Sequence, residues 1–362
     1  MRRKVLALLA AAVAAAAMTS GLASASSTAG PVPAGFAPAS VTFVSASLGW
    51  VLGTAPCSHP PCTSVVRTTD GGHTWQGIPA PRTPLLPFPT ATRGGVLKLR
   101  FADAHNGWAY GTELWATHDG GASWHRITLP MLRPDIIDLE AAGGRVRALI
   151  GSRPAGGGLT RNIHLYSTAV ASDHWHVGAA MPGALELVVH GNHAWVVTES
   201  FGTSSSTPRL YANGAGGWHQ LPDPCDTSVL GAGQLAATSA TRLLFVCVGE
   251  PGAGSANKRA FVSGNGGRSW TRRGAPSRGG DLYYAASSSP TGDFAAAASG
   301  ATELYGSFDG ARHWHNVLGL DDGGLGWSDF GFTTASQGVA VEGQHKLWMT
   351  RDGGHHWSAV TF

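Results

Sequence analysis

A motif that ends in tryptophan recurs along the chain and constrains its fold more than any other feature. Its pattern is Ser/Thr-x-Asp-x-Gly-x-x-Trp, and five nearly intact copies end at Trp75, Trp124, Trp270, Trp314 and Trp357. Degraded copies end at Trp175 and Trp218, so seven tryptophans follow one another at intervals of 49, 51, 43, 52, 44 and 43 residues. A period of this length is typical of one four-stranded blade of a β-propeller.

The chemistry of the motif predicts a self-locking hairpin turn. A short Asp or Asn side chain accepts hydrogen bonds from the backbone N–H groups just ahead of it, and glycine adopts the positive φ that follows. The tryptophan ring then packs under the turn. We therefore interpret the motif residues as structural: Asp70, Trp75, Asp119, Trp124, Asn265, Trp270, Asp309, Trp314, Asp352 and Trp357.

A second pattern lies upstream of the motif, as in residues 41–53, 99–111 and 329–343. It consists of an apolar strand, a polar turn and a second apolar strand. Each repeat then reads as strand, hairpin, strand, loop, strand, motif, strand. The fold prediction is all-β: a single β-propeller of seven four-stranded blades over residues 41–362. We expect the first blade to pack on the last, unless residues 31–39 add an outer strand to the seventh.

The N-terminus has the pattern of an export signal. A basic start, an apolar stretch and the small residues Ala23, Ser24 and Ala25 predict a signal peptide over residues 1–25, cleaved near Ala25. Residues 26–40 form an N-terminal extension. The mature chain should be secreted, monomeric and without a membrane span, because no other segment approaches about 20 consecutive apolar residues.

Four cysteines in an exported chain favour disulfides over metal ligands. Three pairings are possible. We expect Cys57 to pair with Cys62, and Cys225 with Cys247, because each pair lies within one repeat.

The segment FADAHNGWAYGTELWATHDGGASW, residues 101–124, contains both patterns in full. It resembles the Asp-box or BNR-repeat propellers, and in particular those of photosystem II stability and assembly factors, of sortilin-type luminal domains and of xyloglucan-cleaving glycosidases. Sialidases share the Asp box alone. The resemblance covers residues 40 to 362 and implies that ligands bind the face opposite the turn motifs.

That face should carry the long loops between blades and between second and third strands. Loops of this length are uncommon in compact domains unless they serve a function. The candidate ligand-contact residues are their charged side chains: Arg82, Arg93, Arg153, Arg161, Glu199, Asp226, Glu250 and Arg278.

Several functions are disfavoured by composition. A net charge of +3 without a Lys/Arg cluster argues against nucleic acid, and no motif predicts a cofactor. For metals, Asp321 and Asp322, with Asp329 beyond them, are assigned to the Gly-rich link between the last two blades, and a solvated loop is favoured there over a calcium site. Most of the sixteen histidines are interpreted as solvated imidazoles.

No catalytic residue is assigned, because the three convergent arginines of a sialidase are not recognisable, and Tyr283 and Tyr284 are interpreted as core aromatics. The leading hypothesis is a secreted, non-enzymatic propeller that binds a glycan, a cell-wall polymer or a protein partner. Two alternatives remain: an extracellular glycoside hydrolase, and an assembly or folding factor for an exported protein.

Overall fold

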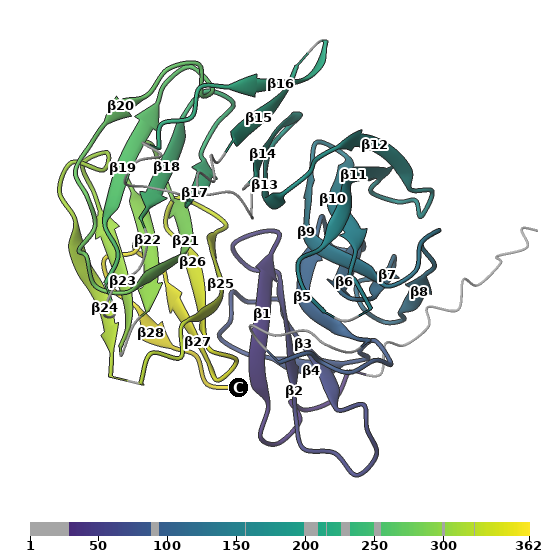
Figure 1. The fold of residues 1–362 in the computed structure, drawn as a ribbon. Helices are drawn as coiled ribbons and strands as arrows, with labels where there is room; N and C mark the ends of the chain where they lie inside the picture. Colours follow the sequence, from purple (N-terminus) through teal and green to yellow (C-terminus); the bar gives the residue numbers. More distant parts are fainter. Residues whose placement is uncertain are drawn as a thin grey trace, which may run out of the picture.

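The computed structural model describes residues 29–87, 94–155, 157–198, 209–214, 216–225, 232–249, 255–298, 301–321 and 323–362. Seven four-stranded antiparallel sheets are arranged in a ring (Figure 1). Each sheet consists of four strands consecutive in sequence. The predicted seven-bladed all-β propeller is therefore confirmed.

The first four blades are formed by these strands: β1 (Ala37–Phe43), β2 (Gly49–Thr54), β3 (Thr63–Thr68) and β4 (Gln76–Ile78); β5 (Val96–Phe101), β6 (Gly107–Gly111), β7 (Leu114–Thr117) and β8 (His125–Ile127); β9 (Pro134–Ala142), β10 (Arg145–Ser152), β11 (Arg161–Ala169) and β12 (His176–Ala180); β13 (Ala184–His190), β14 (His193–Thr198), β15 (Arg209–Gly214) and β16 (Gly217–Leu221).

The other three blades are formed by these: β17 (Ala232–Ala237), β18 (Leu243–Val248), β19 (Lys258–Ser263) and β20 (Thr271–Arg272); β21 (Asp281–Ser287), β22 (Asp293–Ala298), β23 (Thr302–Ser307) and β24 (His315–Leu320); β25 (Trp327–Phe332), β26 (Gly338–Glu342), β27 (Lys346–Thr350) and β28 (Ser358–Ala359).

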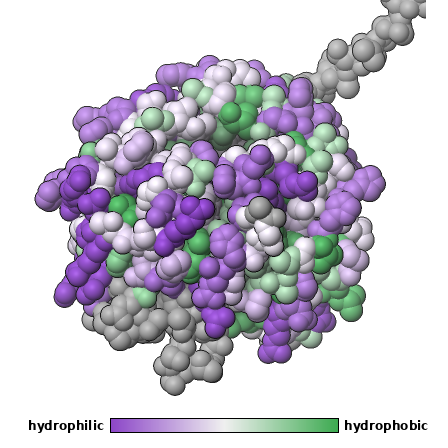
Figure 2. Space-filling view, turned by 90° about the horizontal axis from the view of Figure 1, so that it is seen from above, coloured by the Kyte–Doolittle hydropathy of each residue, from purple (hydrophilic) through white to green (hydrophobic). Residues whose placement is uncertain are grey.

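Burial differs between the strands of a blade in a way that the sequence explains. The second strand is covered on both faces by the neighbouring blades, and β6 and β22 are buried at every position. Such strands are nearly continuously apolar, as in GWAYG and DFAAAA. The fourth strands β8, β20 and β28 are mostly exposed. Figure 2 shows the molecule from above, turned by 90° from the view of Figure 1. On this face hydrophilic side chains dominate, and the hydrophobic ones form small separate groups.

Stacked aromatic rings hold adjacent blades together. Trp50 of β2 stacks on Phe101 of β5, with ring centroids 3.8 Å apart and planes at 2°. Phe294 of β22 stacks on Phe332 of β25 at 4.6 Å. Because adjacent blades share no strand ladder, apolar contacts of this kind supply most of the cohesion of the ring.

The turn motif forms the hydrogen bonds that its residue types predict. In blade 2 the Asp119 carboxylate accepts the Ser123 N–H at 2.8 Å and the Ser123 hydroxyl at 2.6 Å. Thr117 Oγ1 donates to Asp119 and accepts the Gly121 N–H at 2.9 Å. Gly121 has φ +92, and a Cβ there would lie 2.7 Å from Ile78 of blade 1, so the turn requires glycine.

The turn motif also joins neighbouring blades. Trp50 of blade 1 donates its Nε1–H to the Gly120 carbonyl of the blade 2 motif at 3.1 Å. Trp195 of blade 4 makes the same bond to Gly266 of blade 5 at 3.4 Å. The corresponding Trp108 of blade 2 is fully buried, and its Nε1 has no partner among the described residues. Blade 3, which should supply that carbonyl, has a degraded motif.

The two degraded copies differ from the intact ones. Trp218, expected to follow a motif turn, lies inside β16 and pairs with Asn213 of β15. The hairpin closes directly at the Gly214–Gly217 pair, which leaves no room for an Asp-centred turn. In blade 3, Trp175 directly precedes β12, and its Nε1 lacks a partner among the described residues.

The ring closes by packing of β1 against β25 and β26. The segment before β1 does not extend the seventh blade: Gly30 forms an isolated antiparallel bridge with Gly77 of β4, in blade 1. The first strand begins at Ala37, four residues before the expected start of the propeller. The predicted signal peptide, residues 1–25, lies outside the described residues.

Both predicted disulfides, Cys57–Cys62 and Cys225–Cys247, are present. The first closes an exposed loop between β2 and β3. The second ties the link after β16 to the buried Cys247 of β18. Disulfides persist in oxidising compartments, which indicates that the protein resides in one.

Replacing Asp119 by alanine should lower the free energy of unfolding by about 1 kcal/mol, since the backbone N–H groups of the turn lose their acceptor. Asp119→Asn should retain most of the stability, because Asn265 makes the equivalent bond to the Ser269 N–H at 2.9 Å in blade 5. Urea unfolding measures both variants. If both variants lost the same free energy of unfolding, the hydrogen bonds accepted by the side-chain oxygen would not be the source of the stability.

Removing the disulfide that spans the longer loop should cost more stability. The Cys225→Ala/Cys247→Ala pair opens a separation of 22 residues and should lose about 3 kcal/mol, against about 2 kcal/mol for Cys57→Ala/Cys62→Ala, with a separation of 5. Parallel denaturant titrations compare the pairs. A larger loss from the Cys57 pair would contradict the loop-closure argument.

Candidate functional site

The innermost strands of blades 2 to 7 line a central channel of about 570 Å³, and several of the lining side chains are polar or charged. Lys98 and Arg100 come from β5, Asp138 and Glu140 from β9, and Glu186 from β13. Gln234 of β17 and Tyr284 of β21 continue the ring. Alternation along a strand explains this placement, because every second residue points to the same side.

Arg100 is the centre of the charged part of the channel. Its guanidinium donates to Asp329 of β25 at 3.1 and 3.2 Å and to Glu140 at 3.0 Å. Lys98 lies 3.7 Å from the Asp329 carboxylate and donates to the Tyr284 hydroxyl at 2.8 Å. Asp329, expected in a solvated loop, is instead only 2% exposed. The expected environment was wrong, because Trp327 begins an inner strand two residues earlier.

Inner-strand side chains also bond to the backbone of the next blade. Leu99 N–H donates to Ser40 Oγ at 3.0 Å, Leu187 N–H to Asp138 at 2.8 Å and Leu235 N–H to Glu186 at 2.9 Å. Val41 N–H donates to Asp329 at 3.0 Å. These bonds link blades 1 to 2, 3 to 4, 4 to 5 and 7 to 1.

The other three junctions have polar links of different kinds. The Arg100–Glu140 ion pair joins blades 2 and 3. The side-chain amide of Gln234 is oriented so that its nitrogen faces hydrogen-bond acceptors. It then donates to the Tyr283 carbonyl at 3.3 Å, between blades 5 and 6. Tyr284 donates to the Ser328 carbonyl at 2.9 Å between blades 6 and 7. Tyr283 and Tyr284, interpreted as core aromatics, thus also line the channel.

Burial and local charge separate the pKa values of the channel acids. Burial raises the pKa of Glu140 to about 7, although Arg100 opposes the shift. Burial, with the nearby Asp138 and Glu140, raises the pKa of Glu186 well above its usual range. For Asp329, burial would raise the pKa, but Arg100 and Lys98 outweigh it and hold the pKa below the usual range.

The channel chemistry is that of a structural network. Its carboxylates are bound to Arg100 or to backbone N–H groups of the next blade. A glycosidase needs two carboxyl groups free to act on either side of the scissile bond. The described channel lining also contains a single arginine, Arg100, whereas a sialidase-like site needs three.

A second concave site lies on the loop-bearing face, between blades 2 and 3. This groove has a volume of about 640 Å³, and three guanidinium groups line it, those of Arg126, Arg133 and Arg153. Arg126 lies 3.2 Å from Glu113, and Arg153 lies 2.9 Å from Asp135. Arg133 is exposed, with φ 51, in the link that precedes β9.

An apolar hollow of about 260 Å³ adjoins the groove and shares Arg153 with it. Its lining includes Leu159 and Leu185, which are 57% and 40% exposed. Leu132, next to Arg133, is 89% exposed. Exposed leucines beside arginines are typical of an interaction surface.

The four predicted contact residues that the structure describes do not line one common groove. Of the four described, only Arg153 lines the groove. Arg161 begins β11 opposite Ser152 and is exposed. Arg82 and Arg278 are exposed in other inter-blade links. The remaining four lie outside the described residues: Arg93, Glu199, Asp226 and Glu250.

Sequence reasoning missed the channel residues and most of the groove. A signal for the channel exists, since charged residues alternate with apolar ones in LKLRF and IIDLEAA. That alternation marks a strand with one polar face. Arg126 and Arg133 carry no such signal, because one closely follows a turn motif and the other lies in a short link.

No protein-family profile and no curated protein sequence matches the chain. Among solved structures, "YCF48 bound to D1 peptide" is 18% identical with a TM-score of 0.60, covering 90% of this chain and 96% of its own. YCF48 from Cyanidioschyzon merolae is 17% identical with a TM-score of 0.60, covering 90% and 98%. A GH74 xyloglucanase from Xanthomonas campestris has a TM-score of 0.34 at 13% identity, covering 89% and 72%. At these identities the likeness to YCF48 shows a shared propeller fold.

The raised pKa of Glu140 predicts a stability change with pH. A folded pKa near 7, above the ordinary value of 4.5, stabilises the fold below pH 4.5, and that contribution is lost as pH rises to 7. Relative to Glu140→Gln, the native protein should lose about 2 kcal/mol between pH 4.5 and 8, less than the full shift implies because the channel admits water. Denaturant unfolding at each pH measures this. Parallel curves for the two proteins would contradict the prediction.

Proposed function

We propose that this chain is an exported, monomeric, non-enzymatic binding propeller of the Asp-box type, which holds an acidic or C-terminal peptide segment of a partner protein. The groove between blades 2 and 3 is the binding site. One observation supports the proposal most: three arginines and exposed leucines lie close together on the loop-bearing face.

Guanidinium groups bind carboxylates with two parallel hydrogen bonds, which gives both affinity and orientation. Arg126 pairs with Glu113 and Arg153 pairs with Asp135, while Arg133 has no ion pair among the described residues. Among the described residues that line it, the groove has three arginines and one glutamate, a surplus of positive charge. The adjoining leucines would bury apolar side chains of the same peptide.

A protein ligand is favoured over a neutral glycan or cell-wall polymer, because neutral sugars carry no carboxylate for the arginines to bind. A propeller of similar fold, YCF48, has been solved bound to a peptide of D1. An assembly or folding factor for an exported protein is compatible with this ligand class. The two disulfides are consistent with export. Among the described residues, no helix has the length and apolar character required to cross a membrane.

Binding can be tested by fluorescence anisotropy with an acidic, leucine-containing peptide library, each peptide made with a free and with an amidated C-terminus. Arg133→Ala and Arg126→Ala should each weaken binding about tenfold, the equivalent of one charge-assisted hydrogen bond. Arg82→Ala is the matched control, since Arg82 is an exposed arginine in an inter-blade link outside the groove.

Two results would overturn this function. One is equal weakening by Arg82→Ala and Arg133→Ala, which would indicate general charge attraction. The other is hydrolysis of a glycoside or polysaccharide panel by the purified protein that disappears in Glu140→Gln, which would make the protein a glycoside hydrolase.

A further inference from the structure

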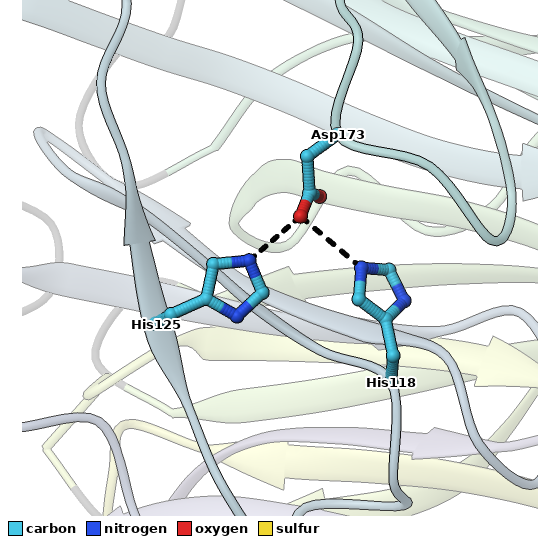
Figure 3. A group of neighbouring side chains, drawn as sticks. All are labelled: His118, His125 and Asp173. Atoms are coloured by element: carbon cyan, nitrogen blue, oxygen red, sulfur yellow. Dashed lines mark hydrogen bonds and ion pairs between the residues drawn. The ribbon is translucent and has the colours of Figure 1, made fainter.

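Two histidines and an aspartate meet on the face opposite the groove, where the turn motifs lie. His118 belongs to the motif turn of blade 2, His125 begins β8 directly after Trp124, and Asp173 lies in the turn between β11 and β12 of blade 3. Figure 3 shows both imidazoles directed at the same carboxylate.

The distances define a compact donor set. His125 Nε2 lies 2.6 Å and His118 Nε2 lies 3.2 Å from Asp173 Oδ2. One ligand atom from each residue falls within 4.8 Å of the others. The side chains keep 31%, 51% and 30% of their surface accessible, for His118, His125 and Asp173, so an ion from solvent can reach them.

A hydrogen-bond chain orients His118. Asn106 donates through Nδ2 to both oxygens of Asp103, at 3.0 and 2.9 Å, which turns its Oδ1 toward His118 Nδ1 at 2.6 Å. Oδ1 only accepts hydrogen bonds, so Nδ1 carries the proton. In the neutral imidazole, Nε2 then presents its lone pair to the Asp173 carboxylate. A lone pair facing an anion is unfavourable unless a proton or a metal ion lies between them.

The Asp173 carboxylate has unused capacity. Its Oδ1 is buried and has no hydrogen-bond partner among the described residues. In the intact motifs the aspartate is committed to its own turn, as Asp119 is to Ser123. The degraded blade 3 motif places Asp173 two residues before Trp175, where its Oδ2 instead faces the two imidazoles.

We propose that His118, His125 and Asp173 bind a divalent transition-metal ion, with zinc as the best fit. Two imidazoles and a carboxylate are typical zinc ligands, and three protein ligands leave the fourth tetrahedral position open. Asn106 accepts a hydrogen bond from Nδ1 of His118 and so orients that ring, as the hydrogen-bond partners of ligating histidines do in metal sites. The site lies across the junction of blades 2 and 3 and goes beyond the peptide-binding function.

The two histidine–aspartate separations can be compared with those around a bound zinc ion, and all three donor atoms lie within 4.8 Å of one another. Tetrahedral ligands about 2.0 Å from zinc lie about 3.3 Å from one another. The His118–Asp173 separation of 3.2 Å already matches. The His125–Asp173 separation of 2.6 Å must open by about 0.7 Å, which rotation of the half-exposed His125 side chain allows.

The test is calorimetric titration of the untagged mature protein with zinc chloride, with visible absorption of the cobalt(II) form as a second readout. We expect one site tighter than any other, with cobalt bands of tetrahedral coordination. His118→Ala, His125→Ala and Asp173→Asn should each lower zinc affinity more than tenfold and remove those bands. Circular dichroism and the melting temperature without metal show whether each variant is folded.

The matched control is His356→Ala, because His356 also lies 2.6 Å from a carboxylate, that of Asp352, on the same face, but belongs to no three-residue donor cluster among the described residues. It should bind zinc like the native protein. Native protein that binds no zinc, or zinc affinity that falls equally in the control and the cluster variants, would overturn the proposal and leave a hydrogen-bonded cluster without an ion. Peptide binding is scored separately, so failure here does not decide the groove.

Discussion

The ring depends on how blades that share no strand ladder hold one another. Stacked rings such as Trp50 on Phe101 supply apolar cohesion between second and first strands. Closer to the axis, each junction has a polar link, and four of them are backbone N–H groups bonded to a side chain of the preceding blade. A buried N–H without a partner is costly. The acidic and polar residues of the channel therefore set the register of neighbouring blades.

This link between blades explains why the channel has several carboxylates and why most of them are hydrogen-bonded or ion-paired. Arg100 pairs with both Asp329 and Glu140; with Lys98 it holds the pKa of Asp329 below its usual range, whereas burial still raises the pKa of Glu140 to about 7. Asp138 and Glu186 are bonded to backbone and have raised pKa values through burial. The same hydrogen bonds and ion pairs that hold the blades together thus occupy the carboxylates of the channel.

The junction of blades 2 and 3 differs from the others and contains both proposed sites. Blade 3 has a degraded motif, so Trp108 lacks the carbonyl that Gly120 offers to Trp50. The loss of the motif frees Asp173 to meet His118 and His125 on one face. On the other face the same junction opens into the groove of Arg126, Arg133 and Arg153. Both proposed sites therefore lie where the sequence of blade 3 departs from the repeated motif.

Blade number, strand order and both disulfides were predictable from sequence, because each depends on local chemistry: a repeated turn with its glycines, period-two strands and cysteines close in the chain. The location of the sites was not, since the groove and the metal cluster each join residues from two blades whose distance follows only from ring closure. Asp329 illustrates the difference. It was grouped with the Gly-rich link that precedes it, yet it meets Arg100, 229 residues away, because the inner strands of all seven blades converge on one axis.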